Sequence, residues 1–354
     1  MLSTNEDADI NSSSNTFSAE VKGFYDEAEE SQGYDNPDDP EITNPRSLSF
    51  DEAARCLSLL GKNDSGLRYS FLMLTASDKL LTDISIIPTF RNLLFVDVSG
   101  NLLTLSEIQI LTAMTYLLMI KADRNRIESA NFQSNMLYLQ VLSLNHNKIR
   151  ETKGISHRLL ECLELSNNSI KAVDLNPYEL ENLKVLEIRG NILTTMNGLL
   201  FQNLRALYIA ENRIERIEGL ETLLNLETLH ARGNFISSFD ALYKTSNICP
   251  KLSYLNLREN KISRISEFRK LQQLKKLEIL VTSQNPFEKN YAVDNSYRIN
   301  LLAIFPGLKR INKDPVLAEE LVEADRIKKH KFPDENISDA DDEVIEQPEP
   351  NATP

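Results

Sequence analysis

The segment LKVLEIRGNIL (residues 183–193) decides the fold of this 354-residue chain. It follows the pattern LxxLxLxxNxL, and the segments LRALYIAENRI (residues 204–214) and LSYLNLRENKI (residues 252–262) repeat it. Nine copies align on an asparagine, at intervals of 21 to 26 residues. These asparagines are Asn101, Asn125, Asn147, Asn168, Asn191, Asn212, Asn234, Asn260 and Asn285. A repeat of this period predicts an array of similar coils that stack on one another.

The spacing has a physical cause. Two apolar residues separated by one position face the same side of a short strand, because strand side chains alternate. The asparagine follows where the chain turns, and its carboxamide can both donate to and accept from the backbone. The pattern therefore predicts a leucine-rich repeat solenoid of the α/β class, a curved horseshoe with a parallel concave sheet and a row of stacked asparagines.

The rest of the chain divides around this array. Ser49-Phe50-Asp51-Glu52 fits a capping box, with Glu52 reaching back to Ser49, so we expect a helical N-terminal cap that Gly61 ends. A weaker copy of the repeat, without the asparagine, starts at Phe71. The expected order is a disordered acidic arm (1–46), a capping helix (47–66), the repeats (67–290), a C-terminal repeat cap (291–313), a helix (314–332) and a disordered acidic tail (333–354).

The charge and composition of the chain exclude several classes of protein. The net charge is −13, which argues against a generally basic nucleic-acid binder. Residues 1–46 carry 12 acidic and two basic side chains, and residues 334–354 carry eight acidic and no basic ones. The three cysteines are scattered, which fits a reducing compartment. The start of the chain lacks the apolar core of a signal peptide, and no apolar run is long enough for a membrane span, so we expect a cytoplasmic protein without a membrane contact.

The sequence offers little support for catalysis. It contains no phosphate-binding glycine loop, no nucleophile elbow and no cysteine or histidine pair at metal-ligand spacing. We therefore expect no enzyme activity, no cofactor, no metal and no small-molecule substrate.

The concave face is the expected binding surface. Its first half carries Asp97, Asp123, Glu164 and Glu187, whereas its later half carries arginine and aromatic side chains, which dominate binding hot spots. The candidate protein-binding residues are Arg189, Tyr208, His230, Arg232, Tyr254 and Arg258. We hypothesise that they bind an acidic protein segment; one of the chain's own acidic arms is the competing occupant. Reversing the charges of Arg232 and Arg258 is expected to weaken binding without changing the melting curve.

Segments between the repeat leucines resemble those of a known protein family. Leu81-Thr82-Asp83-Ile84 and Gly154-Ile155-Ser156-His157 are the most telling, and Leu255-Asn256-Leu257-Arg258 and Glu323-Ala324-Asp325 add to them. On these segments, residues 55–330 resemble the family of leucine-rich repeat-containing protein 23, radial-spoke proteins of motile cilia and sperm flagella. The resemblance implies a place in the radial spoke head, at the third spoke of the axoneme. It also implies a cytoskeletal location and radial spoke head proteins and other axonemal proteins as partners.

Three functions remain open from the sequence. The first is a non-enzymatic structural adaptor of the axoneme that supports ciliary or sperm motility. The second is a leucine-rich repeat regulatory subunit of a protein phosphatase. The third is an RNA-processing adaptor, although the acidic arms argue against direct contact with RNA.

Overall fold

The computed structural model describes residues 44–62, 68–242, 248–291 and 296–331. The chain divides into two units, residues 1–44 and 45–354, and the fold described below belongs to the second. The two arms that the sequence predicts to be disordered lie outside the described residues, apart from residues 44–46 of the first.

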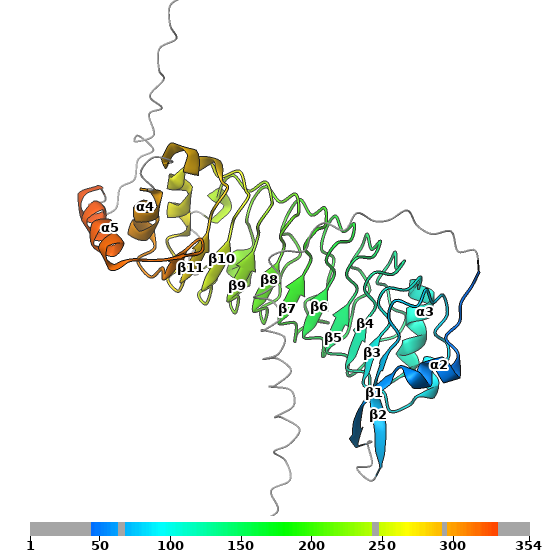
Figure 1. Cartoon of the computed structure of the whole chain (residues 1–354). Helices are drawn as coiled ribbons and strands as arrows, with labels where there is room; N and C mark the ends of the chain where they lie inside the picture. Colours follow the sequence, from blue (N-terminus) through cyan, green and yellow to red (C-terminus); the bar gives the residue numbers. More distant parts are fainter. Residues whose placement is uncertain (1–43, 63–67, 243–247, 292–295, 332–354) are drawn as a thin grey trace, which may run out of the picture. The chain divides into compact units, whose positions relative to one another are not determined.

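Within the described residues, a 13-stranded sheet runs along the array, with its strands in sequence order. The strands from β2 to β12 are parallel, and an antiparallel pair closes each end. The prediction of a leucine-rich repeat solenoid is confirmed, and Figure 1 shows the strands lined along one side of the coils. The strands are β1 (Leu57–Lys62), β2 (Tyr69–Thr75), β3 (Phe95–Asp97), β4 (Met119–Lys121), β5 (Val141–Ser143), β6 (Cys162–Glu164), β7 (Val185–Glu187), β8 (Ala206–Tyr208), β9 (Thr228–His230), β10 (Tyr254–Asn256), β11 (Ile279–Val281), β12 (Arg310–Ile311) and β13 (Asp314–Pro315).

The register of the sheet produces a continuous core. The middle residue of each repeat strand pairs with the middle residue of the next, as in Leu186, Leu207 and Leu229, and all three are fully buried. The first and third residues of each strand therefore face away from the core and form the concave face. The weak first copy is a true coil, because Leu74 and Leu81 are also fully buried.

Short helical turns return the chain on the convex side. They are η1 (Ile87–Thr89), α3 (Leu105–Gln109), η2 (Ile110–Ala113), η3 (Leu220–Thr222), η4 (Asp240–Leu242), η5 (Ile265–Leu271) and η6 (Pro286–Tyr291). Over the later coils, Phe239, Phe268, Phe287 and Tyr297 form an aromatic row with successive ring centroids 5.8, 5.5 and 5.9 Å apart. These rings belong to the same hydrophobic core as the repeat leucines and extend it on the convex side of these coils.

The N-terminal cap differs from the prediction. The helix α2 spans only Phe50–Arg55, and residues 57–62 form β1, which pairs antiparallel with β2. The prediction of one helix over residues 47–66 is therefore wrong in its second half, because the backbone of residues 57–62 pairs with β2, although Leu60 stays exposed in this strand. The Ser49 hydroxyl does accept from the Glu52 N–H, at 3.3 Å, but the Glu52 carboxylate pairs with Arg46 at 2.9 Å instead of completing a capping box.

The C-terminal cap is α4 (Tyr297–Ile304), β12, β13 and α5 (Ala318–Lys331). The final helix thus begins at Ala318, four residues after the predicted start at Asp314, because Asp314 and Pro315 pair with β12. Arg298 of α4 binds the Glu320 carboxylate of α5 through Nε at 2.6 Å and Nη2 at 3.0 Å. This contact joins the last helix to the end of the array.

Candidate functional site

The nine asparagines that share one repeat position form a continuous row inside the array. Each side-chain oxygen accepts a backbone N–H of the preceding coil, and each side-chain nitrogen donates to carbonyls of its own and the preceding coil. Asn212 shows the pattern: its oxygen accepts from the Leu193 N–H at 3.0 Å, and its nitrogen donates to the Ile188, Ile209 and Ala210 carbonyls at 2.9, 3.1 and 3.1 Å. All nine are buried except Asn168, which is half-buried. The row therefore binds each coil to its neighbour.

Asn312 extends this row beyond the nine repeats. Its side-chain oxygen accepts the backbone N–H groups of Thr282 and Ser283, at 2.8 and 3.0 Å, and its nitrogen donates to the Tyr297 hydroxyl at 3.2 Å. The repeat pattern does not predict this amide, because the last coil keeps only Leu308 and Ile311 of the pattern. The amide lets the C-terminal cap bind the array as another coil would.

The residue before each asparagine adopts a left-handed backbone in all nine repeats and in the weak first copy. Three of these ten residues are glycines: Gly100, Gly190 and Gly233. At Gly100 the small residue has a second role, because Arg124 and Asp78 form a 3.0 Å ion pair across it. A Cβ atom at residue 100 would lie only 1.9 Å from the Asp78 carboxylate, so a larger side chain would displace the pair.

The predicted binding residues lie together on the concave face of β7 to β10 and just beyond the strand ends. The rings of Tyr208, His230 and Tyr254 stack in sequence, with centroids 4.8 and 4.7 Å apart. All three are half-buried, so the stack presents an aromatic surface at the concave face. Offset-stacked rings are rigid anchors of the kind found in protein interfaces.

The three arginines are held by carboxylates of this chain. Arg189 binds Glu211 through two nitrogens at 2.8 and 3.1 Å, and Arg232 binds Glu259 through two nitrogens at 3.1 Å each. Arg258 lies 3.2 Å from the same Glu259 carboxylate. Two guanidinium groups therefore share one carboxylate and leave an excess of positive charge beside the stack. Reversing Arg232 and Arg258 together would place three carboxylates side by side, so the expectation of an unchanged melting curve is revised.

An acidic network covers the middle of the concave face. The Ser143 hydroxyl lies 2.7 Å from both the Asp123 and the Glu164 carboxylates, and the Ser166 hydroxyl donates to Glu187 at 2.9 Å. Burial raises the pKa of Asp123, and burial together with the charge of Glu164 raises the pKa of Glu187. Since a hydroxyl has one proton to donate, a proton on Asp123 would complete both contacts of Ser143. The two halves of the concave face thus differ in charge, as the sequence predicts.

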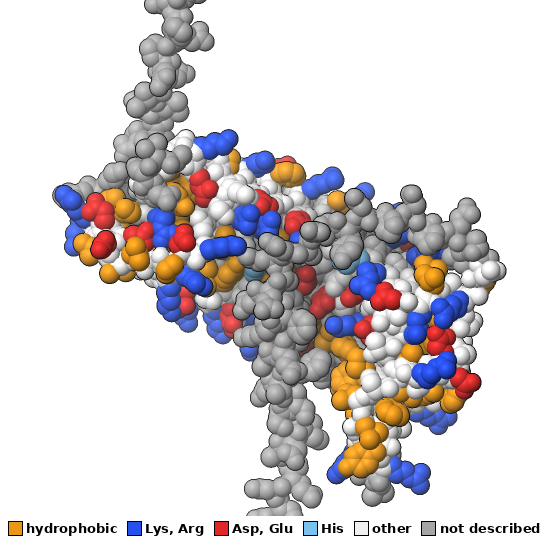
Figure 2. Space-filling model, viewed as in Figure 1, with side chains coloured by type: hydrophobic (Ala, Val, Ile, Leu, Met, Phe, Trp, Pro, Cys, Tyr) orange, Lys and Arg blue, Asp and Glu red, His pale blue; other side chains and the backbone are white. Residues whose placement is uncertain are grey.

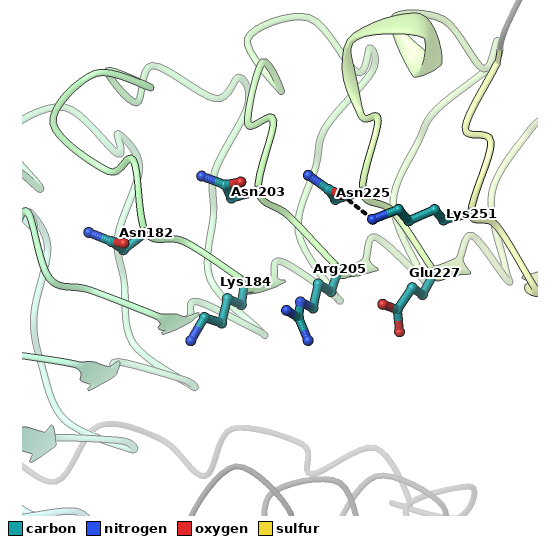
Figure 3. A pocket seen from close by; sticks show the side chains of 7 residues that line it. All are labelled: Asn182, Lys184, Asn203, Arg205, Asn225, Glu227 and Lys251. Carbon is teal, nitrogen blue, oxygen red and sulfur yellow. Dashed lines mark hydrogen bonds between the residues drawn. The ribbon is translucent and has the colours of Figure 1, made fainter. Parts of the chain in front are cut away.

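A second row of amides lies along the edge where the chain enters the strands (Figure 3). Asn182, Asn203 and Asn225 each donate to a backbone carbonyl of the preceding coil, at 2.9, 2.8 and 2.8 Å. They line a hollow with Lys184, Arg205, Glu227 and Lys251. The sequence carries a signal for this row, because an asparagine precedes the first leucine in three successive repeats, at a position outside the LxxLxLxxNxL pattern.

His157 is the most perturbed histidine of the described chain. It is fully buried, its Nδ1 accepts the Met136 N–H at 3.2 Å, and burial lowers its pKa to about 4. The imidazole is therefore neutral near pH 7, and its contact with Met136 joins its coil to the preceding one. No group of three or more metal-ligating side chains occurs among the residues in the described ranges, and no helix there is long and apolar enough to cross a membrane.

Comparison with known proteins gives the family. Human leucine-rich repeat-containing protein 23 is 38% identical over 290 residues, which cover 82% of each chain, and the Xenopus tropicalis protein of the same name is 37% identical over 274 residues, 77% of this chain and 76% of that one. The chain belongs to the leucine-rich repeat-containing protein 23 family. The resemblance drawn from the inter-leucine segments is thereby confirmed.

Two further comparisons concern the fold. The family model for the NXF1/2/3/5 leucine-rich repeat domain matches residues 214–313. The functional domain of InlJ from Listeria monocytogenes, which includes a cysteine ladder, is similar in structure with a TM-score of 0.52 at 20% identity, over 68% of this chain. This chain spans about half the length of that InlJ chain, 48%, and the likeness bears on the fold alone. Both the family and the fold are typical of non-enzymatic protein-interaction scaffolds.

Proposed function

We propose that this member of the leucine-rich repeat-containing protein 23 family is a non-enzymatic structural adaptor of the ciliary or flagellar axoneme. In this proposal it belongs to the head of the third radial spoke and binds other spoke proteins. It resides in the cytoplasm and cytoskeleton, along the axoneme, and supports ciliary or sperm motility. The observation that carries the proposal is the match to the family over about four-fifths of the chain.

The architecture suits a load-bearing adaptor. One hydrogen-bonded sheet and one row of amides connect the two caps without a break between β2 and β12. Because each coil is stable only against its neighbours, such an array transmits force along its whole length. A mechanical link between axonemal structures needs this property.

The aromatic end of the concave face is the proposed contact with a spoke protein. Tyr208, His230 and Tyr254 supply a rigid stack, and Arg232 with Arg258 supplies the excess positive charge described above. An acidic segment with an apolar or aromatic residue fits this combination, since its carboxylates meet the guanidinium groups and its ring meets the stack.

Localisation tests the proposal directly. A tagged copy expressed in motile ciliated cells should give a regularly spaced signal along the axoneme by immuno-electron microscopy, and it should copurify with spoke proteins. A diffuse cytosolic or nuclear signal contradicts the axonemal role. Copurification of a phosphatase without spoke proteins would support the regulatory-subunit hypothesis instead.

A matched pair of variants tests the contact surface. Tyr208→Ala with Tyr254→Ala should reduce recovery of spoke proteins at least fivefold. The control, Tyr116→Ala with Tyr138→Ala, removes two tyrosines outside this stack, whose rings stack on each other with centroids 5.7 Å apart. Equal recovery with both variants would exclude the concave stack as the contact.

A further inference from the structure

Two adjoining hollows form one groove along the edge where the chain enters the strands of the later coils. The first lies beside β7 to β10 and the second beside β10 to β12, and Lys251 lines both. Each encloses about 400 Å³. We call them together the basic edge groove. The described residues that line it include five cations and two carboxylates, Lys184, Arg205, Lys251, Lys275 and Lys276 against Glu227 and Glu278.

Much of this positive charge is available to a ligand. Lys184 forms a 2.7 Å ion pair with Glu161, and Lys251 donates to the Asn225 side chain at 2.7 Å. By contrast, Arg205, Lys275 and Lys276 are exposed and form no ion pair with any residue in the described ranges. These three cations therefore have no carboxylate partner within the described array.

The second row of amides, at the edge where the chain enters the strands, adds neutral hydrogen-bond donors to the same groove. Asn182 and Asn203 each use one side-chain N–H to bind the preceding coil, and Figure 3 shows both in a line above Lys184 and Arg205. An amide group carries two N–H donors, so one remains on each for a ligand. Cations and amide donors side by side fit an extended segment rich in carboxylates.

We propose that the occupant is the chain's own C-terminal acidic segment, residues 334–354. This segment holds eight acidic and no basic side chains, which matches the charge of the groove. It follows α5, which the Arg298–Glu320 contact fixes at the end of the array where Lys275 and Lys276 lie. The proposal concerns a surface distinct from the concave face and does not depend on the axonemal role.

The length of the segment suffices for this contact. The groove passes the starts of β7 to β12, five strand spacings or roughly 24 Å, which about eight extended residues can span. The 23 residues after Lys331 extend to about 75 Å at most, so the segment can leave α5 and still follow the groove. The tether holds the acidic side chains at an effective concentration near the millimolar range, which compensates for the weakness of each exposed ion pair.

Binding of the acidic segment to the groove should depend on salt, because the charges that form the contact are exposed to solvent. Screening shortens the range of exposed charges from about 10 Å at 0.1 M salt to about 3 Å at 1 M. The segment therefore occupies the groove at low ionic strength and leaves it at high ionic strength. While bound, it blocks access of any other acidic ligand to this edge.

Cross-linking of the full chain tests the proposal. A zero-length carbodiimide reagent at 50 mM NaCl should join Lys251, Lys275 or Lys276 to carboxylates of residues 334–354, and mass spectrometry should no longer detect these links at 0.5 M NaCl. The yield should not change on tenfold dilution. A yield that falls on dilution would assign the groove to a second copy, links to residues 1–46 would assign it to the other arm, and absence of links would exclude an occupant of this kind; each result overturns the proposal.

A binding measurement uses the same chemistry with a matched control. The full chain with the acidic residues of 334–354 changed to Asn and Gln should bind a fluorescein-labelled peptide of residues 334–354, and anisotropy should detect it. Lys275→Glu with Lys276→Glu should weaken binding at least tenfold. Lys171→Glu with Lys261→Glu changes the net charge equally at exposed lysines outside the groove and should leave binding within twofold. Equal weakening by both pairs would reduce the effect to net charge and refute the groove as the site.

Discussion

Replacing Asn212 by alanine tests the contribution of the buried amide row. The substitution removes one bond accepted from Leu193 and three donated to backbone carbonyls. The carbonyls of Ile188 and Ile209 each keep one amide donor, from Asn191 and Asn234, at 3.1 and 2.9 Å. The Leu193 N–H loses the side-chain acceptor that it has in the structure, so this buried donor dominates the loss.

The expected destabilisation is a few kilocalories per mole. A buried donor without a partner costs about 1–3 kcal/mol, and the weakened carbonyl contacts add about 1 kcal/mol. We therefore expect a loss of about 2–4 kcal/mol, which lowers the ratio of folded to unfolded chain roughly thirty-fold to a thousand-fold. Asn203→Ala in the same coil is the matched control: its amide is exposed and makes one bond at 2.8 Å, so it should cost less than about 1 kcal/mol.

Urea unfolding followed by circular dichroism and tyrosine fluorescence measures the difference, since the chain contains no tryptophan. Coincidence of the two signals checks that the array unfolds as one unit, which repeat proteins do not always do. If Asn212→Ala and Asn203→Ala shift the midpoint by the same amount, the reasoning that the amide row holds the coils together is refuted.

Three further predictions concern other parts of the array. Burial lowers the pKa of His157 to about 4, so the unfolded chain binds a proton that the folded chain does not; stability should fall by at most about 3 kcal/mol between pH 6.5 and 4, and His157→Asn should remove this part of a urea–pH profile. Gly190→Ala combines a left-handed backbone with a Cβ atom 2.2 Å from Asn167, whereas Gly219→Ala has the same backbone and open space; the first should lower the melting temperature clearly more than the second, which should cost about 1 kcal/mol, and equal shifts would show that the close approach relaxes. The hydrogen bond from Arg298 lowers the pKa of Glu320. Glu320→Gln should leave Arg298 with Asp314, at 3.9 Å, as its remaining carboxylate contact, destabilise α5 by about 1–3 kcal/mol and speed its limited proteolysis, while unchanged cleavage would show that the Arg298–Glu320 ion pair does not hold α5.

The repeat positions that point into the core could be read from the sequence, because each has one physical requirement. The position of Leu186 requires an apolar side chain that can be buried, and the position of Asn191 requires an amide that bonds to the turn. Both requirements recur in every repeat. The sequence does not predict the left-handed residue before each asparagine, because Gly100, Arg124 and Glu211 share a backbone angle and no side-chain chemistry. A conformational requirement that many residue types meet leaves no residue signature.

The ends and the surface depended on long-range contacts that spacing does not record. Residues 57–62 have an apolar pattern that suits a helix, and only their pairing with β2 makes them a strand. The sequence predicts Arg232 and Arg258 beside the aromatic stack. Their shared partner Glu259 lies at another repeat position, directly before Asn260, so the concave-face pattern does not include its charge. Side-chain pairing across coils requires the register of the sheet, which the structure supplies.

Because every coil bonds to its neighbours in the same way, the length of this array can change by one whole coil at a time. Excising residues 192–212 would join Asn191 to Arg213 and keep the spacing of leucines and asparagines at the junction. Every remaining amide would still meet a coil on either side, while the two caps would come closer by about 4.8 Å. Duplication of such a segment would move them apart by the same increment. Each coil adds the same length to the array. The number of coils therefore sets the distance between two partners that bind the two caps.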